Sequence, residues 1–205
     1  MSPGRSVGVW ALPLPLPLPF YALLLAVGCH GTPRPTIAAC PTSPVRVRSQ
    51  ADLDALRPCT SLAGLDLRGA VPFDLTPLEH LARIEGDLVI RGTFALGSVR
   101  LPALTHVGGE IAIIGNLDLA GVYLPALVRA RSLVVTDAPP LIEIMLSSLA
   151  ELPGDLRLAR LPSLELVDLS ALPAVGGAVA VEAAPFINTW LGPTETRAPP
   201  MQSQD

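Results

Sequence analysis

The sequence predicts a mainly β chain: a short right-handed β-solenoid of five or six coils, about 22–23 residues per coil, with one N-terminal capping helix. Two observations carry this prediction. Pairs of apolar residues separated by one position recur along the chain, and half of all residues are apolar although only 4% are aromatic. An alternating pair indicates a strand with one buried face. An aliphatic core is typical of stacked, regular layers.

The apolar pairs share one sequence step, which we take as the repeat length. Their first members are Leu65, Leu88, Ile111, Leu133, Leu156 and Val179, so the successive steps are 23, 23, 22, 23 and 23 residues. Three further columns, which begin at Phe73, Leu78 and Val99, keep the same register. A fixed period of this kind indicates a repeat architecture. No stretch of about ten residues keeps a helical period free of Pro and Gly, so we expect no helix in each repeat.

Glycines stand just before the first strand of most repeats, at Gly64, Gly86, Gly109, Gly154 and Gly177. Glycine at this place permits either a positive φ or a close approach of two backbones. The third coil carries Arg-Ser instead and is one residue shorter. One repeat buries about six aliphatic side chains, worth roughly 10 kcal/mol, which is less than the cost of ordering its residues. Stability must therefore come from stacking between neighbouring coils.

Both ends of the stack need caps, because an open end exposes a core layer and strand edges. Residues 45–47 predict a short strand, and Ser49 with Asp52 resembles a capping box that opens a helix carrying Leu53. The polar, Pro-rich segment 192–205 is predicted to be a disordered tail. We expect the far end to be covered by four apolar residues, Phe186, Ile187, Trp190 and Leu191.

Residues 1–28 have the composition of a signal peptide. Arg5 supplies a positive charge, and the uninterrupted apolar part runs only from Phe20 to Val27, a length typical of a signal-peptide core. The preceding LPLPLPLP would make a poor transmembrane helix, because a proline inside a helix costs about 3 kcal/mol. The alternative is an N-terminal membrane anchor that is never cleaved.

The apolar run ends in LLAVGC, residues 24–29, which resembles the lipobox of bacterial lipoproteins. The resemblance implies cleavage before Cys29, lipidation of its sulfur, and attachment to the cell envelope. His30, rather than Asp, after the cysteine resembles the outer-membrane case. Residues 29–39 would then be the lipidated cysteine and its tether, and residues 40–191 the solenoid. The alternative is an ordinary signal peptide, with Cys29 a cysteine like any other.

The cysteine count supports the lipobox. The chain has three cysteines, and an odd number in an exported protein leaves one thiol to explain. If Cys29 is lipidated, Cys40 and Cys59 remain as a pair for a disulfide in an oxidising compartment. Such a bridge stabilises by roughly 3 kcal/mol in the loop-entropy model. We expect no metal here, because two cysteines without a nearby histidine or third cysteine do not complete a tetrahedral site.

The run VRVRSQADLDALRPCTSLAGLDL, residues 45–67, is similar to the opening of the receptor L domain. That domain is the leucine-rich, right-handed β-helix of insulin- and epidermal-growth-factor-receptor ectodomains. Later matches are EGDLVIRG, GGEIAIIGN and PGDLRL, so the resemblance covers about residues 40–187. It implies a binding role through sheet surfaces, since receptor L domains bind protein ligands in this way. A receptor kinase role does not transfer, because the chain carries no kinase sequence.

The residue types argue against a catalytic site. No nucleophile elbow, zinc-binding motif, phosphate loop or dinucleotide fingerprint is present. The three histidines, at 30, 80 and 106, fall on different repeat positions, and the chain has no lysine. With a net charge of −4 and no basic face, nucleic acid is not an expected partner. We therefore expect no catalytic residue, metal or cofactor. A β-helix carbohydrate-active enzyme is the alternative, although its clustered carboxylates are missing.

The outward positions of the central coils predict a binding surface with an apolar centre and charged borders. These residues are Val89, Ala112, Val134, Ile114 and Arg91 on the first strands, and Tyr123 and Met145 on the second strands. Apolar surface with a polar rim often marks an interaction site, and aromatic side chains often anchor partners. Alternatively, loops cover these residues, or they reflect strand propensity alone.

The expected function is thus that of a non-enzymatic cell-envelope lipoprotein. Its membrane contact is the lipid, and its ligand is a protein, a glycan or a second copy of the chain. A purely structural envelope protein is a further alternative.

Overall fold

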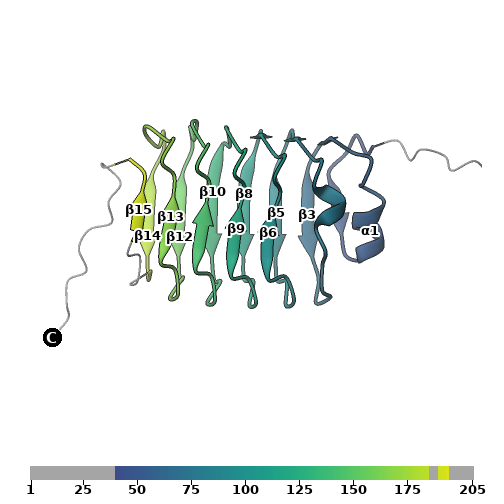
Figure 1. The fold of residues 1–205 in the computed structure, drawn as a ribbon, viewed down its shortest axis with the longest axis horizontal. Coiled ribbons are helices and arrows are strands. Elements are labelled where there is room, and N and C mark those ends of the chain that lie inside the picture. Colours follow the sequence, from purple (N-terminus) through teal and green to yellow (C-terminus); the bar gives the residue numbers. More distant parts are fainter. Residues whose placement is uncertain (1–39, 185–188, 194–205) are drawn as a thin grey trace, which may run out of the picture. The chain divides into compact units, whose positions relative to one another are not determined.

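The computed structural model describes residues 40–184 and 189–193. They form a right-handed parallel β-solenoid of about six turns, which confirms the predicted fold class. The coils follow one another in chain order from α1 to β15 (Figure 1). Within these residues the helical segments are α1 at Gln50–Asp54 and the short 3-10 helix η1 at Thr76–Leu78.

A seven-stranded parallel sheet forms one wall of every coil. Its order is β1-β3-β5-β8-β10-β12-β14. The strands are β1 Val45–Val47, β3 Leu65–Arg68, β5 Leu88–Arg91, β8 Glu110–Ile114, β10 Ser132–Thr136, β12 Leu156–Ala159 and β14 Val179–Glu182. The predicted column of first residues is a true ladder, because Leu65, Leu88 and Ile111 are paired in register from strand to strand.

A five-stranded parallel sheet forms the second wall, in the order β15-β13-β11-β9-β6. Its strands are β6 Ser98–Arg100, β9 Gly121–Tyr123, β11 Glu143–Met145, β13 Leu166–Asp168 and β15 Thr189–Leu191. A third sheet of two-residue strands joins the walls, with β2 Ser61–Leu62, β4 Arg83–Ile84 and β7 His106–Val107. The sequence predicted two strands per repeat, and it did not predict this third strand.

The strands of the five-stranded sheet from β6 to β13 are each followed by a turn that begins and ends with a leucine, the two leucines standing three residues apart. The N–H of Leu104 donates to the carbonyl of Leu101, and the N–H of Leu127 donates to that of Leu124. These four side chains are all buried. Proline follows the first leucine of both turns, where its fixed φ favours a β-turn. The L-x-x-L motif therefore encodes a turn with both ends in the core.

The glycines before the first strand are required by close approach, not by positive φ. A Cβ at Gly86 would lie 2.6 Å from the carbonyl oxygen of Ala63 in the preceding coil. A Cβ at Gly109 would lie 2.8 Å from the carbonyl carbon of Gly86. The backbones of successive coils thus meet at this corner, and a side chain would separate them.

Positive φ occurs instead at the corner after the first strand. Gly92 and Gly115 have φ of 60° and 67° there, and the same column continues with Asp137 at 57° and Arg160 at 55°. These last two side chains form an ion pair along the stack. Nothing lies within 4 Å of a Cβ placed at Gly92 or Gly115, so this corner has open space. That space explains why residues with side chains occupy the same column in the later coils.

One buried polar pair interrupts the aliphatic core. The Oδ1 of Asn116 accepts from the Thr93 N–H at 3.1 Å and from the Thr93 hydroxyl at 2.8 Å, and its Nδ2 donates to the Ile90 carbonyl at 3.1 Å. Thr93 and Asn116 are both fully buried. Their polar groups are paired with one another and the backbone, as buried polar groups must be.

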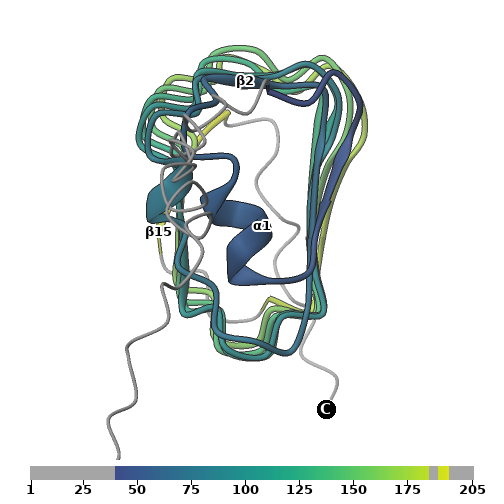
Figure 2. The ribbon, with the colours of Figure 1, turned by 90° about the vertical axis from the view of Figure 1, so that its right-hand side faces the viewer.

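The N-terminal cap has the predicted form. Figure 1 shows α1 at one end of the stack, and the view along the stack in Figure 2 shows it lying across the area that the coils enclose. The Ser49 hydroxyl accepts from the Asp52 N–H, and the Asp52 carboxylate accepts from the Ser49 N–H, so the capping box is confirmed. Leu53 is fully buried beneath the helix. The disulfide Cys40–Cys59, with a Cα–Cα distance of 5.5 Å, closes this end as expected.

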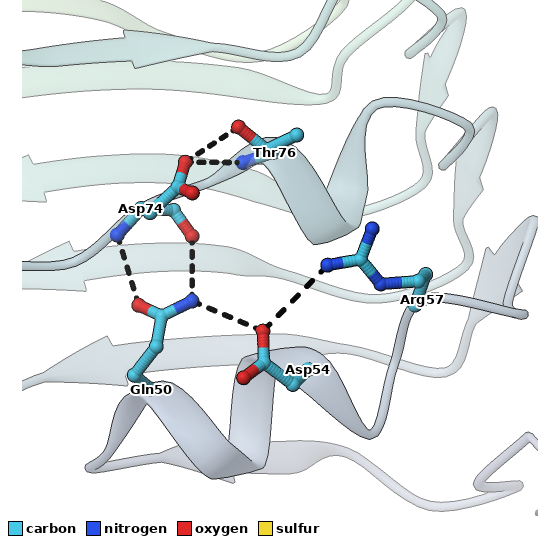
Figure 3. A network of polar contacts seen from close by, with 5 residues as sticks. All are labelled: Gln50, Asp54, Arg57, Asp74 and Thr76. Atoms are coloured by element: carbon cyan, nitrogen blue, oxygen red, sulfur yellow. Dashed lines mark hydrogen bonds and ion pairs between the residues drawn. The ribbon is translucent and has the colours of Figure 1, made fainter.

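The Gln50 side chain binds backbone groups of the first coil that have no earlier coil to bind them. Its amide binds both backbone groups of Asp74, accepting from the N–H at 2.9 Å and donating to the carbonyl at 3.0 Å. The Asp74 carboxylate in turn accepts from the N–H and hydroxyl of Thr76, while Asp54 binds Gln50 and Arg57 (Figure 3). Gly97 and Ala120 occupy the position of Asp74 in the next two coils. There the N–H of Ala120 donates to the carbonyl of Gly97 in the preceding coil, so no glutamine is needed.

The C-terminal layer of the solenoid is less covered than the others. Val179 and Val181 are half-buried, whereas the paired Leu156 and Leu158 are fully buried. The predicted cover falls on Phe186 and Ile187, which lie outside the described residues, and on two residues of β15 for which only the backbone is described.

The predicted signal peptide, Cys29, the tether and the tail beyond residue 193 also lie outside the described residues. Among the residues that the structure describes, no helix is long and apolar enough to cross a membrane.

Candidate functional site

The outer face of the seven-stranded sheet carries two columns of outward side chains within the strands, and a third column stands where the strands begin. The middle column contains Asp66, Val89, Ala112, Val134 and Arg157, which are paired strand to strand. The next outward column, two residues later on each strand, contains Arg68, Arg91, Ile114, Thr136 and Ala159. The seven strands carry no aromatic side chain.

The apolar centre of this face is more tightly packed than an open patch. Val89, Ile114 and Val134 point outward and are half-buried, while Ala112 is buried with 4% exposure. Neighbouring strands lie about 4.8 Å apart, so branched side chains in one column cover each other's flanks. The predicted apolar residues on this sheet therefore lie together and present a flat surface.

Three arginines surround one carboxylate on β1, β3 and β5. Arg68 binds Asp66 with two hydrogen bonds, Nε to Oδ1 at 2.7 Å and a terminal nitrogen to Oδ2 at 2.6 Å. Arg91 approaches Oδ2 at 3.7 Å and Arg46 at 3.9 Å. The hydrogen bonds from Arg68, then the charge of Arg68 and after it that of Arg91, lower the pKa of Asp66. The Asp66 carboxylate is only 16% exposed, against 72% for Arg46 and 44% for Arg91.

An acidic column runs along the edge where the strands begin. Asp87, Glu110 and Asp155 are exposed there. The Oδ1 of Asp87 accepts from the N–H of Glu110 at 2.9 Å, and the Oδ1 of Asp155 accepts from the N–H of Ala178 at 2.8 Å. The carboxylates of Asp87 and Asp155 thus connect successive coils. They also make this edge negative, opposite in sign to the arginine end of the face.

Tyr123 and Met145 lie on the five-stranded sheet, so the structure does not bring them together with the other predicted residues. The guanidinium carbon of Arg100 lies 3.9 Å from the centre of the Tyr123 ring. The Tyr123 hydroxyl donates to the Glu143 carboxylate, and this hydrogen bond raises the pKa of Tyr123. The ring also covers Gly121, since a Cβ there would lie 2.5 Å from the hydroxyl oxygen. Tyr123 is therefore held within its own sheet.

The largest apolar exposure lies elsewhere and was missed from the sequence. Val71, Phe94 and Leu117 are 41%, 50% and 50% exposed, one in each of three successive coils. Pro139 and Pro162 continue the column. We call these five residues the turn ridge. These residues keep the repeat step, so the sequence contained a signal for them. The predicted binding surface considered strand residues only, whereas the turn ridge lies in a turn between two strands.

Open hollows also lie between described residues away from the seven-stranded face, and we describe two of them. One, of about 410 Å³, is bordered by η1 and β6 and lined by Asp74, Glu79 and Arg100, among others. Asp74 there is engaged with Thr76, whose hydroxyl and N–H lower the Asp74 pKa. The other, of about 440 Å³, is lined by Gly108, Arg129, Arg131, Pro153 and Gly154. Arg129 is paired with Glu151 at 2.6 Å.

The described histidines lie apart. His106 is on β7, with Nδ1 2.9 Å from the Thr105 hydroxyl, whereas His80 is exposed beside Glu79. Within residues 40–184 and 189–193, no three His, Cys, Asp or Glu side chains are grouped as metal ligands.

No family model, curated protein or solved structure matches this chain. The parallel β-solenoid is therefore established from the structure itself.

Proposed function

We propose that this protein is an exported, lipid-anchored binding protein of the bacterial cell envelope. Its solenoid presents the outer face of the seven-stranded sheet to a partner. The observation that carries the proposal is the composition of that face: a flat apolar centre of Val89, Ile114 and Val134 between arginine-bearing strands. Such a surface offers area and charge for recognition. The sequence resemblance to receptor L domains, which bind protein ligands through sheet surfaces, supports the same role.

Five of the described carboxylates form structural contacts, which supports a binding role over a catalytic one. Asp52 and Asp74 bind backbone N–H groups at turns, Asp87 and Asp155 connect coils, and Asp137 pairs with Arg160. A glycosidase instead needs two carboxyl groups set about 5–9 Å apart across a substrate. A β-helix carbohydrate-active enzyme remains the alternative. Release of reducing ends from envelope glycans by the purified protein would favour that alternative.

The binding surface is tested by the paired substitution Val89→Glu and Val134→Glu. Both side chains point outward, so we expect the circular dichroism spectrum and the unfolding midpoint to stay close to wild type. Recovery of envelope proteins by the immobilised protein, compared with wild type by mass spectrometry, should fall at least tenfold for the specific partner. Unchanged recovery would refute this face as the binding surface. Unfolding would show that these valines belong to the core.

The cellular address is tested by intact mass spectrometry of protein extracted from membranes, with and without reduction. We expect a chain that lacks residues 1–28, carries a lipid mass on Cys29, and gains two daltons when the Cys40–Cys59 disulfide is reduced. A chain with no lipid would refute the anchor while leaving the solenoid and its disulfide unaffected.

A further inference from the structure

The outer face of the seven-stranded sheet has an uneven charge distribution that restricts what it can bind. At the end formed by β1, β3 and β5, three arginines share one carboxylate, so two positive charges remain uncompensated within the cluster. Along the starting edge of the strands, Asp87, Glu110 and Asp155 add exposed negative charge. At the β12 and β14 end, Arg157 lies 3.9 Å from Glu182. Excess positive charge on this face is therefore confined to the Asp66 cluster.

Within that cluster, two arginines retain hydrogen-bonding capacity. Arg68 already directs its Nε and one terminal nitrogen to Asp66 as a two-bond contact. Arg46 and Arg91 touch the same Oδ2 only at 3.9 and 3.7 Å, beyond hydrogen-bonding distance, and both guanidinium groups are well exposed. A guanidinium binds a carboxylate best through two parallel hydrogen bonds. The position between Arg46 and Arg91 is therefore ready to accept a second carboxylate beside Asp66.

The apolar centre begins directly beside this position. Arg91 and Val89 point outward from the same strand, and Ala112, Ile114 and Val134 follow on the next two strands. Two strand spacings span about 10 Å, which equals roughly three residues of an extended chain. The face thus offers an anion position at one end of a short apolar strip.

Two classes of ligand fit this face poorly. Neutral sugars are commonly held by stacking on aromatic rings, and the described strands of this sheet carry none. A uniform polyanion would meet the acidic column of Asp87, Glu110 and Asp155 at the strand starts, where like charges repel. A protein segment with one acidic end and apolar residues beyond it meets neither obstacle.

We infer that the partner contributes a protein segment in which an acidic side chain adjoins an apolar stretch. The acidic side chain binds Arg46 and Arg91 next to Asp66, and the apolar residues cover Val89, Ile114 and Val134. This inference rests on the proposed binding function of the same face. It adds the chemistry of the bound segment and its placement along the stack, with the acidic side chain at β1 to β5 and the apolar residues toward β10.

The test uses the full mature protein and three fluorescent probes. The first peptide carries two acidic residues before a Val- and Ile-containing stretch, the second has Gln in place of both acids, and the third probe is polyglutamate. In fluorescence anisotropy at low salt, the acidic–apolar peptide should bind at least tenfold more tightly than the other two. Its advantage over the Gln peptide should shrink as salt screens the arginines.

Two variants identify the site. Arg46→Gln with Arg91→Gln should reduce the affinity for the acidic–apolar peptide to that for the Gln peptide. Arg129→Gln with Arg131→Gln is the matched control, because it removes two exposed positive charges away from this face, and it should leave the affinity unchanged. Equal binding of all three probes, no binding of the acidic–apolar peptide, or an equal loss in the control variant would overturn the inference.

These outcomes are separable from the failure of the proposed function. If Val89→Glu with Val134→Glu abolishes partner recovery while the arginine variants leave it unchanged, the face binds a partner but the acidic segment is refuted. If the valine variants leave partner recovery unchanged, the binding face itself is refuted.

Discussion

At the scale of single residues, two kinds of glycine meet different demands. Gly109 stands where coils touch, and its Cβ would lie 2.8 Å from the backbone of Gly86. Gly97 has nothing within 4 Å of a Cβ, and its φ is not positive. Gly92 also faces open space but has a φ of 60°. Of these three glycines the sequence pattern singled out only Gly109, and there it did not separate close approach from positive φ.

Three alanine substitutions test this distinction by urea denaturation. Gly109→Ala should lower the free energy of unfolding by about 1–3 kcal/mol, because the coils must separate to admit the methyl group. Gly92→Ala should cost about 1 kcal/mol through backbone strain. Gly97→Ala should be neutral or stabilise by up to about 1 kcal/mol, because it restricts the unfolded chain. Equal effects at Gly109 and Gly97 would contradict the close approach of coils.

The buried Asn116 provides a second residue-scale prediction. Asn116→Leu removes the acceptor for both the N–H and the hydroxyl of Thr93. We expect a loss of about 2–4 kcal/mol in the free energy of unfolding, because two buried donors are left unpaired. Adding Thr93→Val should cost less than the sum of the single effects, since the hydroxyl is then absent. Additive losses would show that the two side chains are not coupled.

The charge cluster around Asp66 predicts a pH dependence. The folded-state pKa of Asp66 is lowered, first by the Arg68 hydrogen bonds. Its contribution is therefore present above the unfolded pKa of about 4 and is lost as the pH falls through the folded value. Wild type should lose more stability between pH 5 and about pH 2 than Asp66→Asn does, as measured by denaturant unfolding at each pH. Parallel losses would show that Asp66 gains nothing from its arginines.

At the scale of elements, the N-terminal cap combines a helix, a disulfide and a glutamine. α1 places Leu53 on the open end of the core, and the Cys40–Cys59 bridge holds the first strand against the cap. Gln50 hydrogen-bonds the backbone N–H and carbonyl of Asp74, which have no hydrogen-bond partner in a preceding coil. The capping box and the cysteine pair were predictable, because each has a local sequence pattern. The Gln50 contact was not, because it depends on a residue 24 positions away.

The disulfide prediction belongs to this element. Replacing both Cys40 and Cys59 with Ser should lower the free energy of unfolding by roughly 3 kcal/mol, mainly by freeing the unfolded chain. Reduction of the wild-type protein should produce the same loss. A much smaller loss by either route would show that the cap is held by α1 and Gln50 alone.

The third sheet illustrates what element-scale prediction missed. Leu62, Ile84 and Val107 belong to the repeat and are buried, so the pattern contained their column. Their strands have only two residues each, which is too short for alternation to be visible. The outward direction of Val89 and Val134 followed from alternation. Their half-buried state did not, because it arises from neighbours 22 or 23 residues away.

At the scale of the whole molecule, stability is a property of neighbouring coils. Each coil pairs in register with the next, and buried columns continue from one coil to another. Such a stack behaves as a one-dimensional array. The period could be predicted from the sequence because every coil contributes the same positions. The charged borders of the outer face were part of the prediction, but the place of Arg46 beside Asp66 was not, because Arg46 belongs to the shorter cap coil and falls outside that period.

The array predicts tolerance to deletion of one complete coil. Removing residues 133–155 would join Ser132 to Leu156 and restore the register, because Leu133 and Leu156 are ladder partners. We expect a β-type circular dichroism spectrum and cooperative unfolding at lower denaturant. Removing only residues 133–143 should prevent folding, since the remaining columns no longer align. Equal behaviour of the two deletions would contradict a stack of equivalent coils.

The central claim is that the outer face of the seven-stranded sheet binds a protein partner, and photocrosslinking in intact cells tests it most directly. A photoreactive residue is placed at Val89 or Val134 on this face, and at Val128, Ile142 or Leu117 elsewhere on the described surface. The account predicts one adduct, identified by mass spectrometry, from Val89 and Val134, and none from the more exposed control positions. Adducts only from Leu117 on the turn ridge, or equally from every position, would contradict it.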